Sequence, residues 1–141
     1  MSSRTILVVE DNPSDVELTR RAFGKVGVEV ELVVVEDGQE ALDYLFGCAA
    51  EDLPKVTLLD LRLPKVPGLE VLRQIRAEPK TRRMPVVILS TSKEERDVAA
   101  SYDLGVNSYI RKPVDYSQFT EFISHLSWYW LTINEPPPPQ V

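Results

Sequence analysis

Polar side chains suited to metal and phosphate chemistry stand at the ends of four apolar runs in this 141-residue chain. Glu10 and Asp11 follow the first run, Asp60 the third, Ser90 the fourth and Lys112 the fifth. Two carboxylates 4 Å apart repel each other by about 1 to 4 kcal/mol, so three brought together need a cation. Oxygen ligands with room for water suit Mg2+, which often bridges carboxylates to phosphate. Singly, each residue fits an ordinary turn or helix cap; together, they predict a magnesium site.

These residues meet only if the runs form neighbouring strands of one parallel sheet. Short β-branched runs alternate about five times with stretches whose apolar residues recur at helical spacing, which is typical of an α/β domain. The expected strands are 5–9, 28–35, 56–59, 86–90 and 107–110. Right-handed crossovers then predict a flavodoxin-like (βα)5 doubly wound parallel sheet with strand order 2-1-3-4-5. Ligands bind at the carboxyl ends of such strands, near the switch between strands one and three.

Helix signals follow the expected strands. The first helix begins either after Asn12, with Pro13 at its first position, or after Ser14, with Glu17 completing a capping box. The fourth helix is expected over about 93–103.

The end of the chain predicts an amphipathic helix followed by a tail. Apolar residues recur there at helical spacing along one face, namely Phe119, Ile123, Leu126 and Trp130. We therefore expect one domain over 1–131, including this helix, and a flexible proline-rich tail over 132–141.

Composition limits the class of protein. The chain is 43% hydrophobic and 27% charged, which is typical of a folded domain and unlike a disordered chain. It has no apolar run of the roughly 18 residues that span a bilayer, and it has a single cysteine, which favours a cytoplasmic location. The 22 acidic residues outnumber the 16 basic ones, and the net charge of -6 disfavours nucleic acid and gives no reason to expect a membrane partner.

Four segments resemble the receiver domain of two-component response regulators, and the resemblance extends over about residues 5–126. The segments are VVEDNPSD with its acidic pair, LLDLRLPKVPGLEVL with Asp60, PVVILSTS with Ser90, and SYIRKPVD with Lys112. The resemblance implies the fold expected above and a role as a phosphorylated signalling domain.

The resemblance implies a task for each residue at the strand ends. Asp60 accepts a phosphoryl group from a histidine kinase, and it holds Mg2+ together with Glu10 and Asp11. Ser90 binds a phosphoryl oxygen, and Lys112 pairs with the phosphoryl group. The physical chemistry agrees, because a carboxylate that attacks an already negative phosphoryl group needs nearby cations to neutralise charge.

Two neighbouring positions flank the phosphoryl group in this family. Arg62 lies two residues after Asp60, and Ser92 lies two residues after Ser90. We expect the backbone carbonyl of Arg62 to complete the metal site. Its side chain either flanks the phosphoryl group or forms a salt bridge with the acidic residues.

Two features concern the end of the fifth strand. Tyr109 is either a half-buried strand aromatic or the rotameric switch by which the family senses movement of Ser90, and we favour the switch. Lys112 precedes Pro113, and a cis peptide bond there would turn the ammonium towards the other site residues.

More narrowly, the chain is similar to the small single-domain regulators that work with cyanobacterial and bacterial phytochrome histidine kinases. The segments that carry this similarity include VEDNPSDVELTRRAF, LDLRLPKVPGLEVLRQI and the closing HLSWYWLTI. The similarity implies a phytochrome-type histidine kinase as partner. Because the chain stops soon after the last helix, we expect no output domain and signalling through the receiver's own surface.

Three consecutive aromatic or large residues extend the last helix. At about 100° per residue, Trp128 points away from the packed face, with Tyr129 and Trp130 beside it. A large aromatic side chain that faces outward predicts an interface. We expect a homodimer through the face made by the fourth helix, the fifth strand and the last helix. The alternative is that the extension folds back over its own sheet edge.

Other function classes fit less well. A magnesium-dependent aspartyl-phosphate hydrolase would carry D-x-D at its nucleophile, whereas here Arg62 follows Asp60 by two residues. A flavodoxin-type flavin carrier needs a phosphate loop where this chain has Glu10 and Asp11, whose charges would repel the flavin phosphate. A degenerate receiver that binds partners without phosphorylation conflicts with the intact set of acids, hydroxyl and lysine. We therefore expect a signalling protein and no enzyme.

Overall fold

Five parallel strands form one sheet in the computed structural model, which describes residues 4–27, 29–112 and 115–138. The strands are β1 (Thr5–Val9), β2 (Glu31–Val35), β3 (Val56–Leu59), β4 (Val86–Ser90) and β5 (Ser108–Arg111). Their order is β2-β1-β3-β4-β5, which confirms the flavodoxin-like topology predicted from the sequence. Strands β1, β3 and β4 are buried along their whole length, whereas the edge strands β2 and β5 are partly exposed.

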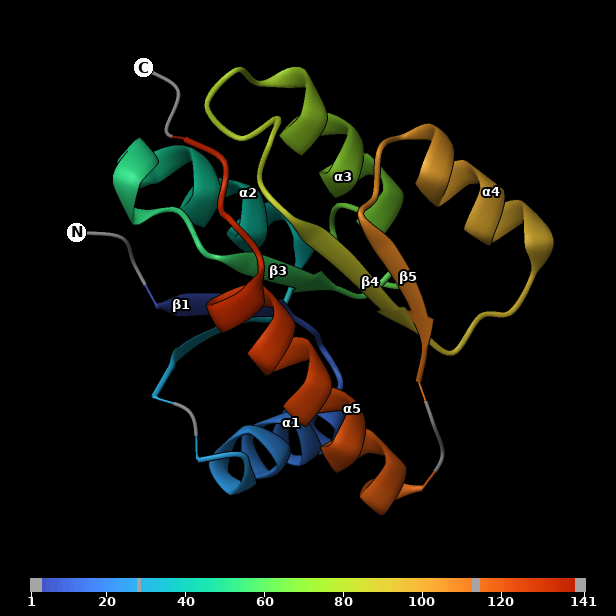
Figure 1. Cartoon of the computed structure of the whole chain (residues 1–141). Coiled ribbons are helices and arrows are strands. Elements are labelled where there is room, and N and C mark those ends of the chain that lie inside the picture. Colours follow the sequence, from blue (N-terminus) through green and yellow to red (C-terminus); the bar gives the residue numbers. More distant parts are fainter. Residues whose placement is uncertain (1–3, 28, 113–114, 139–141) are drawn as a thin grey trace.

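Within the described residues, α-helices cover both faces of the sheet (Figure 1). They are α1 (Pro13–Lys25), α2 (Gly38–Gly47), α3 (Gly68–Ala77), α4 (Glu95–Asp103) and α5 (Tyr116–Trp128), with a short 3-10 turn at Ala50–Asp52. Helices α1 and α5 lie on one face, and α2, α3 and α4 lie on the other. The core therefore has two apolar layers, one with Phe23 and Ile123 from α1 and α5, the other with Leu42 and Leu72 from α2 and α3.

The first helix begins where Asn12 caps it. Oδ1 of Asn12 accepts hydrogen bonds from the backbone N–H groups of Ser14 and Asp15, at 2.9 and 3.2 Å. The first of the two starts considered above is therefore the one the chain uses, with Pro13 at the first helical position.

Three element boundaries differ from the expected ones. Strand β2 begins at Glu31 rather than at residue 28, because the first ladder hydrogen bond on this side runs from the Glu31 N–H to the Arg4 carbonyl. Helix α4 begins at Glu95 rather than at 93. Strand β5 begins at Ser108; Asn107 lies just before it, and its side-chain oxygen accepts a hydrogen bond from the N–H of Val86, the first residue of β4.

The end of the chain changes helix type. The α-helix α5 ends at Trp128, and a π-helical turn continues over Tyr129–Ile133. Trp130 is half-buried and packs against the core layer of α1 and α5, as the expected apolar face of this helix requires. The helical chain thus reaches two residues past 131, and the division into a domain and a tail stays a prediction. No helix in the described part of the chain has the length and apolar character to cross a membrane.

Candidate functional site

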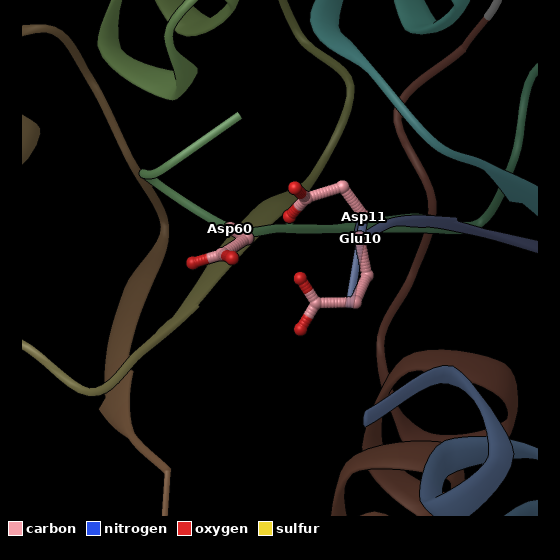
Figure 2. A group of neighbouring side chains, drawn as sticks. All are labelled: Glu10, Asp11 and Asp60. Carbon is pink, nitrogen blue, oxygen red and sulfur yellow. The ribbon is translucent and has the colours of Figure 1, made fainter. Parts of the chain in front are cut away.

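The register of the sheet brings the acidic residues together. Val9 of β1 pairs with Leu59 of β3, so Glu10 and Asp60 leave neighbouring strands at the same level. The Asp60 N–H donates to the Val9 carbonyl at 3.2 Å, which ties the two strand ends to each other. Figure 2 shows the side chains of Glu10, Asp11 and Asp60 gathered beyond the ends of β1 and β3.

These three carboxylates fit a divalent metal ion. One oxygen from each of Glu10, Asp11 and Asp60 lies within 4.8 Å of the other two. Glu10 is buried, Asp60 is half-buried and Asp11 is exposed, so the group opens to solvent on one side. Oε2 of Glu10 is buried and has no hydrogen-bond partner within the described residues. A buried oxygen without a partner, beside two more carboxylates and open to water, matches the oxygen ligands and retained waters that Mg2+ prefers.

Lys112 supplies the positive charge that the acidic group needs. Its Nζ lies 2.5 Å from Oε1 of Glu10, 3.1 Å from Oδ2 of Asp15 and 3.9 Å from Oδ2 of Asp60. The backbone places it there, because the Lys112 N–H continues the ladder of β4 and β5 by donating to the Ser90 carbonyl at 2.9 Å. The lysine is thus shared among three carboxylates rather than paired with one.

The pKa values follow from this crowding. Burial raises the pKa of Glu10 to about 8; the neighbouring Asp60 adds to the rise and Lys112 opposes it. Burial lowers the pKa of Lys112, but its hydrogen bond to Glu10 and the charge of Asp60 outweigh burial, so the net shift is upward. Lys112 therefore stays charged, while Glu10 has to lose a proton before it can bind a cation at neutral pH.

The Asp60 side chain is held by the loop that follows it. Its Oδ1 accepts a hydrogen bond from the Leu61 N–H at 2.8 Å. Gly68, the first residue of α3, packs directly against this turn, where an added Cβ would lie 2.3 Å from the Asp60 carbonyl oxygen. The Gly68 N–H also donates to the Leu61 carbonyl at 3.0 Å. A glycine is required here by close approach, and it keeps the carboxylate in a fixed position at the end of β3.

Ser90 and Tyr109 meet through a third residue. Ser90 is buried, and its Oγ accepts a hydrogen bond from the Ser92 N–H at 3.0 Å. The hydroxyl of Tyr109 is half-buried and donates to the Ser92 carbonyl at 2.9 Å. The hydroxyl groups of Ser90 and Tyr109 are therefore linked through the backbone of Ser92, which lies in the loop after β4.

Some sequence expectations at the site are not met or fall outside the described residues. Arg62 is exposed and forms no ion pair with any residue that the structure describes, so the alternative of a salt bridge with the acidic residues is not found. Its backbone carbonyl as a metal ligand stays a prediction. The peptide bond from Lys112 leads to Pro113, which lies outside the described residues.

Sequence reasoning missed one residue of the site and the contacts of another. Asp15, on the first turn of α1, contacts Lys112 although 97 residues separate them. The only signal was its place in the segment VVEDNPSD, one helical turn beyond the acidic pair. Ser92 was expected to flank the phosphoryl group, but its bonds to Ser90 and Tyr109 depend on loop geometry that residue types do not reveal.

Known proteins are similar to this chain over most of its length. The chain is 40% identical to the phosphorylated cyanobacterial phytochrome response regulator RcpA, whose crystal structure overlays with a TM-score of 0.88 over 97% of this chain and 100% of that one. The Mn2+-bound form of the response regulator Rcp1, from Synechocystis sp., is 35% identical and has a TM-score of 0.85, over 95% and 99% of the two chains. The probable methanogenesis regulatory protein FilR2 of Methanothrix harundinacea is 41% identical over 136 residues, 95% of this chain and 88% of that protein.

The family model of the response regulator receiver domain matches residues 6–124. That range contains all five strands apart from Thr5, the first residue of β1, and it contains every residue of the acidic group together with Lys112. Receiver domains are signalling modules that bind a divalent metal and work with histidine kinases. The chain belongs to the response regulator receiver domain family.

Proposed function

We propose that this receiver domain accepts a phosphoryl group on Asp60 from a histidine kinase. One observation carries the proposal: the Asp60 carboxylate ends a central strand within reach of both the acidic pair, Glu10 and Asp11, and the ammonium of Lys112. A nucleophile between a metal site and a lysine has the charge neutralisation that phosphoryl transfer needs.

The transfer step is a substitution at phosphorus. An oxygen of Asp60 forms the new bond to phosphorus while the bond between phosphorus and the imidazole nitrogen of the kinase breaks. The imidazole leaves with the bonding electron pair and takes up a proton. Lys112 and the hydroxyl of Ser90 pair with phosphoryl oxygens. Mg2+ held by Glu10, Asp11, Asp60 and the Arg62 carbonyl would offset the remaining negative charge when bound.

Acetyl phosphate with magnesium tests the acceptor, because this small donor replaces the kinase. Intact mass should show one added phosphoryl group on the wild type and none on Asp60→Asn. Asp43→Asn, an exposed carboxylate on α2, is the matched control and should be labelled like the wild type. A labelled Asp60→Asn protein, or an unlabelled wild type under conditions that keep it folded, would contradict the proposal.

The partner that we propose is a phytochrome-type histidine kinase in the cytoplasm. RcpA is a phytochrome response regulator and is 40% identical to this chain, which supports this pairing. A relative of equal similarity, FilR2, is described as a methanogenesis regulator, so the kinase has to be tested directly. Phosphotransfer from a phytochrome kinase should be faster than from an unrelated histidine kinase at equal concentration. Equal rates would contradict the proposed pairing with a phytochrome-type kinase, but they would not contradict the proposal that Asp60 is the acceptor.

The signalling surface that we propose is the face of α4, β5 and α5, and the same face forms a homodimer. Exposed aromatic side chains support it: Trp128 is 55% exposed and Tyr129 is 46% exposed. A cleft of about 740 Å3 lies beside them, lined by residues of β5, α5 and the last segment, among them Ile110, Phe122 and Trp130. Trp130 turns inward, as the fold-back alternative requires, whereas the exposed side chains of Trp128 and Tyr129 offer apolar area that a second copy of the chain can cover.

We propose that the receiver domain covers residues 1–131 and that the proline-rich tail covers 132–141.

A further inference from the structure

Ser92 makes hydrogen bonds in three directions at the start of the loop between β4 and α4. Its N–H donates to Oγ of Ser90 at 3.0 Å, and its carbonyl accepts from the Tyr109 hydroxyl at 2.9 Å. Its own hydroxyl donates to Oδ2 of Asp97 at 2.5 Å. Ser92 is only 8% exposed, so these groups cannot exchange their partners for water without moving.

Asp97 connects this loop to helix α4. Glu94, which precedes the helix, gives it no side-chain cap. Oγ of Ser92 accepts a hydrogen bond from the Glu94 N–H at 3.3 Å and donates to Asp97 in the first turn, so it takes the place of a cap. The Asp97 carbonyl in turn accepts from the buried hydroxyl of Ser101 at 2.7 Å, one turn further along α4.

We propose that Ser92 and Asp97 are positioning residues that transmit the state of Ser90 to helix α4. The inference rests on the proposed function, since it assumes that phosphorylation draws the Ser90 hydroxyl towards Asp60. When that hydroxyl moves, the Ser92 N–H loses its acceptor in a buried place, where a lost hydrogen bond costs more than at the surface. The loop then shifts, and the Ser92 to Asp97 bond carries the shift into the first turn of α4.

Tyr109 alone does not explain how α4 would respond. Its hydroxyl bonds to the Ser92 carbonyl and not to α4. In contrast, Asp97 lies within α4 and is bonded to Ser92 by a hydroxyl to carboxylate bond, which is stronger than a bond between neutral groups. The route from Ser90 to α4 therefore passes through two hydrogen bonds, one from the Ser92 backbone N–H to Oγ of Ser90 and one from the Ser92 hydroxyl to the Asp97 carboxylate.

Hydrogen exchange with and without beryllofluoride and magnesium tests the inference, because beryllofluoride mimics the phosphoryl group on the acceptor. In the wild type, exchange should change in both the 90–92 segment and the first turn of α4. Asp97→Ala should raise basal exchange of that first turn roughly tenfold, the loss expected for a hydrogen bond to a charged group. Beryllofluoride should then change exchange at 90–92 but no longer in α4.

Asp97→Asn keeps an acceptor oxygen and should restore the response of α4. Ser92→Ala leaves the helix sequence intact and should reproduce the loss seen in Asp97→Ala. Glu95→Ala removes an exposed carboxylate from the same first turn and controls for the helix dipole, so it should respond like the wild type.

The inference is overturned if Asp97→Ala or Ser92→Ala keeps the full beryllofluoride response of α4, or if Glu95→Ala loses it as well. Phosphoryl labelling of each variant with acetyl phosphate is measured in parallel by intact mass. If the wild type is labelled on Asp60 and the Ser92→Ala and Asp97→Ala variants still pass the response to α4, this inference alone is overturned. A wild type that is never labelled overturns the proposed function itself.

Discussion

The ammonium of Lys112 lies 2.5 Å from Oε1 of Glu10 but 3.9 Å from Oδ2 of Asp60, the proposed acceptor. Asp15 holds the same ammonium from the other side, at 3.1 Å. In this state Lys112 is bonded to the carboxylates around the acceptor rather than to the acceptor itself. For Lys112 to pair with a phosphoryl group on Asp60, it has to leave at least one of these bonds.

We predict that Asp15→Asn speeds phosphorylation by acetyl phosphate about two- to fivefold. Asp15 is partly exposed, and an ion pair of this kind contributes about 0.5 to 1 kcal/mol. The wild type has to break this pair before Lys112 can reach the phosphoryl group, whereas Asp15→Asn does not. The initial rate of mass gain measures the effect. Glu17→Gln, an exposed carboxylate on α1, should leave the rate unchanged. A rate for Asp15→Asn equal to or below that of the wild type would show that Asp15 does not compete for Lys112.

The pKa of Glu10 predicts how stability depends on pH without metal. Its pKa is raised from 4.5 to about 8 in the folded chain, so folding favours the protonated form. The stabilising contribution is present below pH 4.5 and is lost as the pH rises towards 8. Glu10→Gln removes the titration and should raise Tm by roughly 3 to 6 °C near pH 8.5, with little effect near pH 4.5. Thermal unfolding in EDTA checks this, and a pH-independent difference would contradict it.

Most of the fold could be predicted from the sequence because its signals are local. Strands β1, β3 and β4 are continuous apolar runs, as strands covered on both faces must be. Once the topology is fixed, the residues after β1 and β3 have to be neighbours, which is why the acidic group is where it was expected. The roles of these residues in phosphoryl transfer stay predictions.

The remaining features depend on contacts that no local pattern encodes. Whether Asp15 reaches Lys112 depends on the angle between α1 and the end of β5. The late start of α4 depends on Ser92 using its hydroxyl in the turn before the helix. The exposed position of Arg62 depends on the loop after β3. Each is set by tertiary packing or loop conformation, so residue type and spacing leave it open.

We expect Mg2+ binding to require Asp11, although its side chain is exposed. It contributes one of the three clustered carboxylates on the open side of the site, where an ion enters with its waters. We predict weak Mg2+ binding to the unphosphorylated wild type and none to Asp11→Asn, measured by calorimetric titration. Asp37→Asn is unsuitable as a control, because Asp37 caps α2; Asp43→Asn serves instead. Unchanged binding to Asp11→Asn would exclude Asp11 from the site.

The aromatic residues at the end of α5 predict self-association. Trp128 and Tyr129 are exposed beside the cleft next to β5, and burying one ring contributes about 2 kcal/mol at 25 cal/mol per Å2. Sedimentation velocity over a range of concentrations should show a dimer for the wild type and a weaker one for Trp128→Ala/Tyr129→Ala. Tyr102→Ala, an exposed aromatic on α4, shows whether the interface extends to that helix. A wild type that stays monomeric at every concentration would refute the dimer, and an equally strong dimer in the double variant would refute this interface.

The proposed hydrogen-bond route from Ser90 ends on α4 and Tyr109. If this face is the interface, beryllofluoride should therefore shift the association constant of the dimer, and the same sedimentation experiment measures that shift.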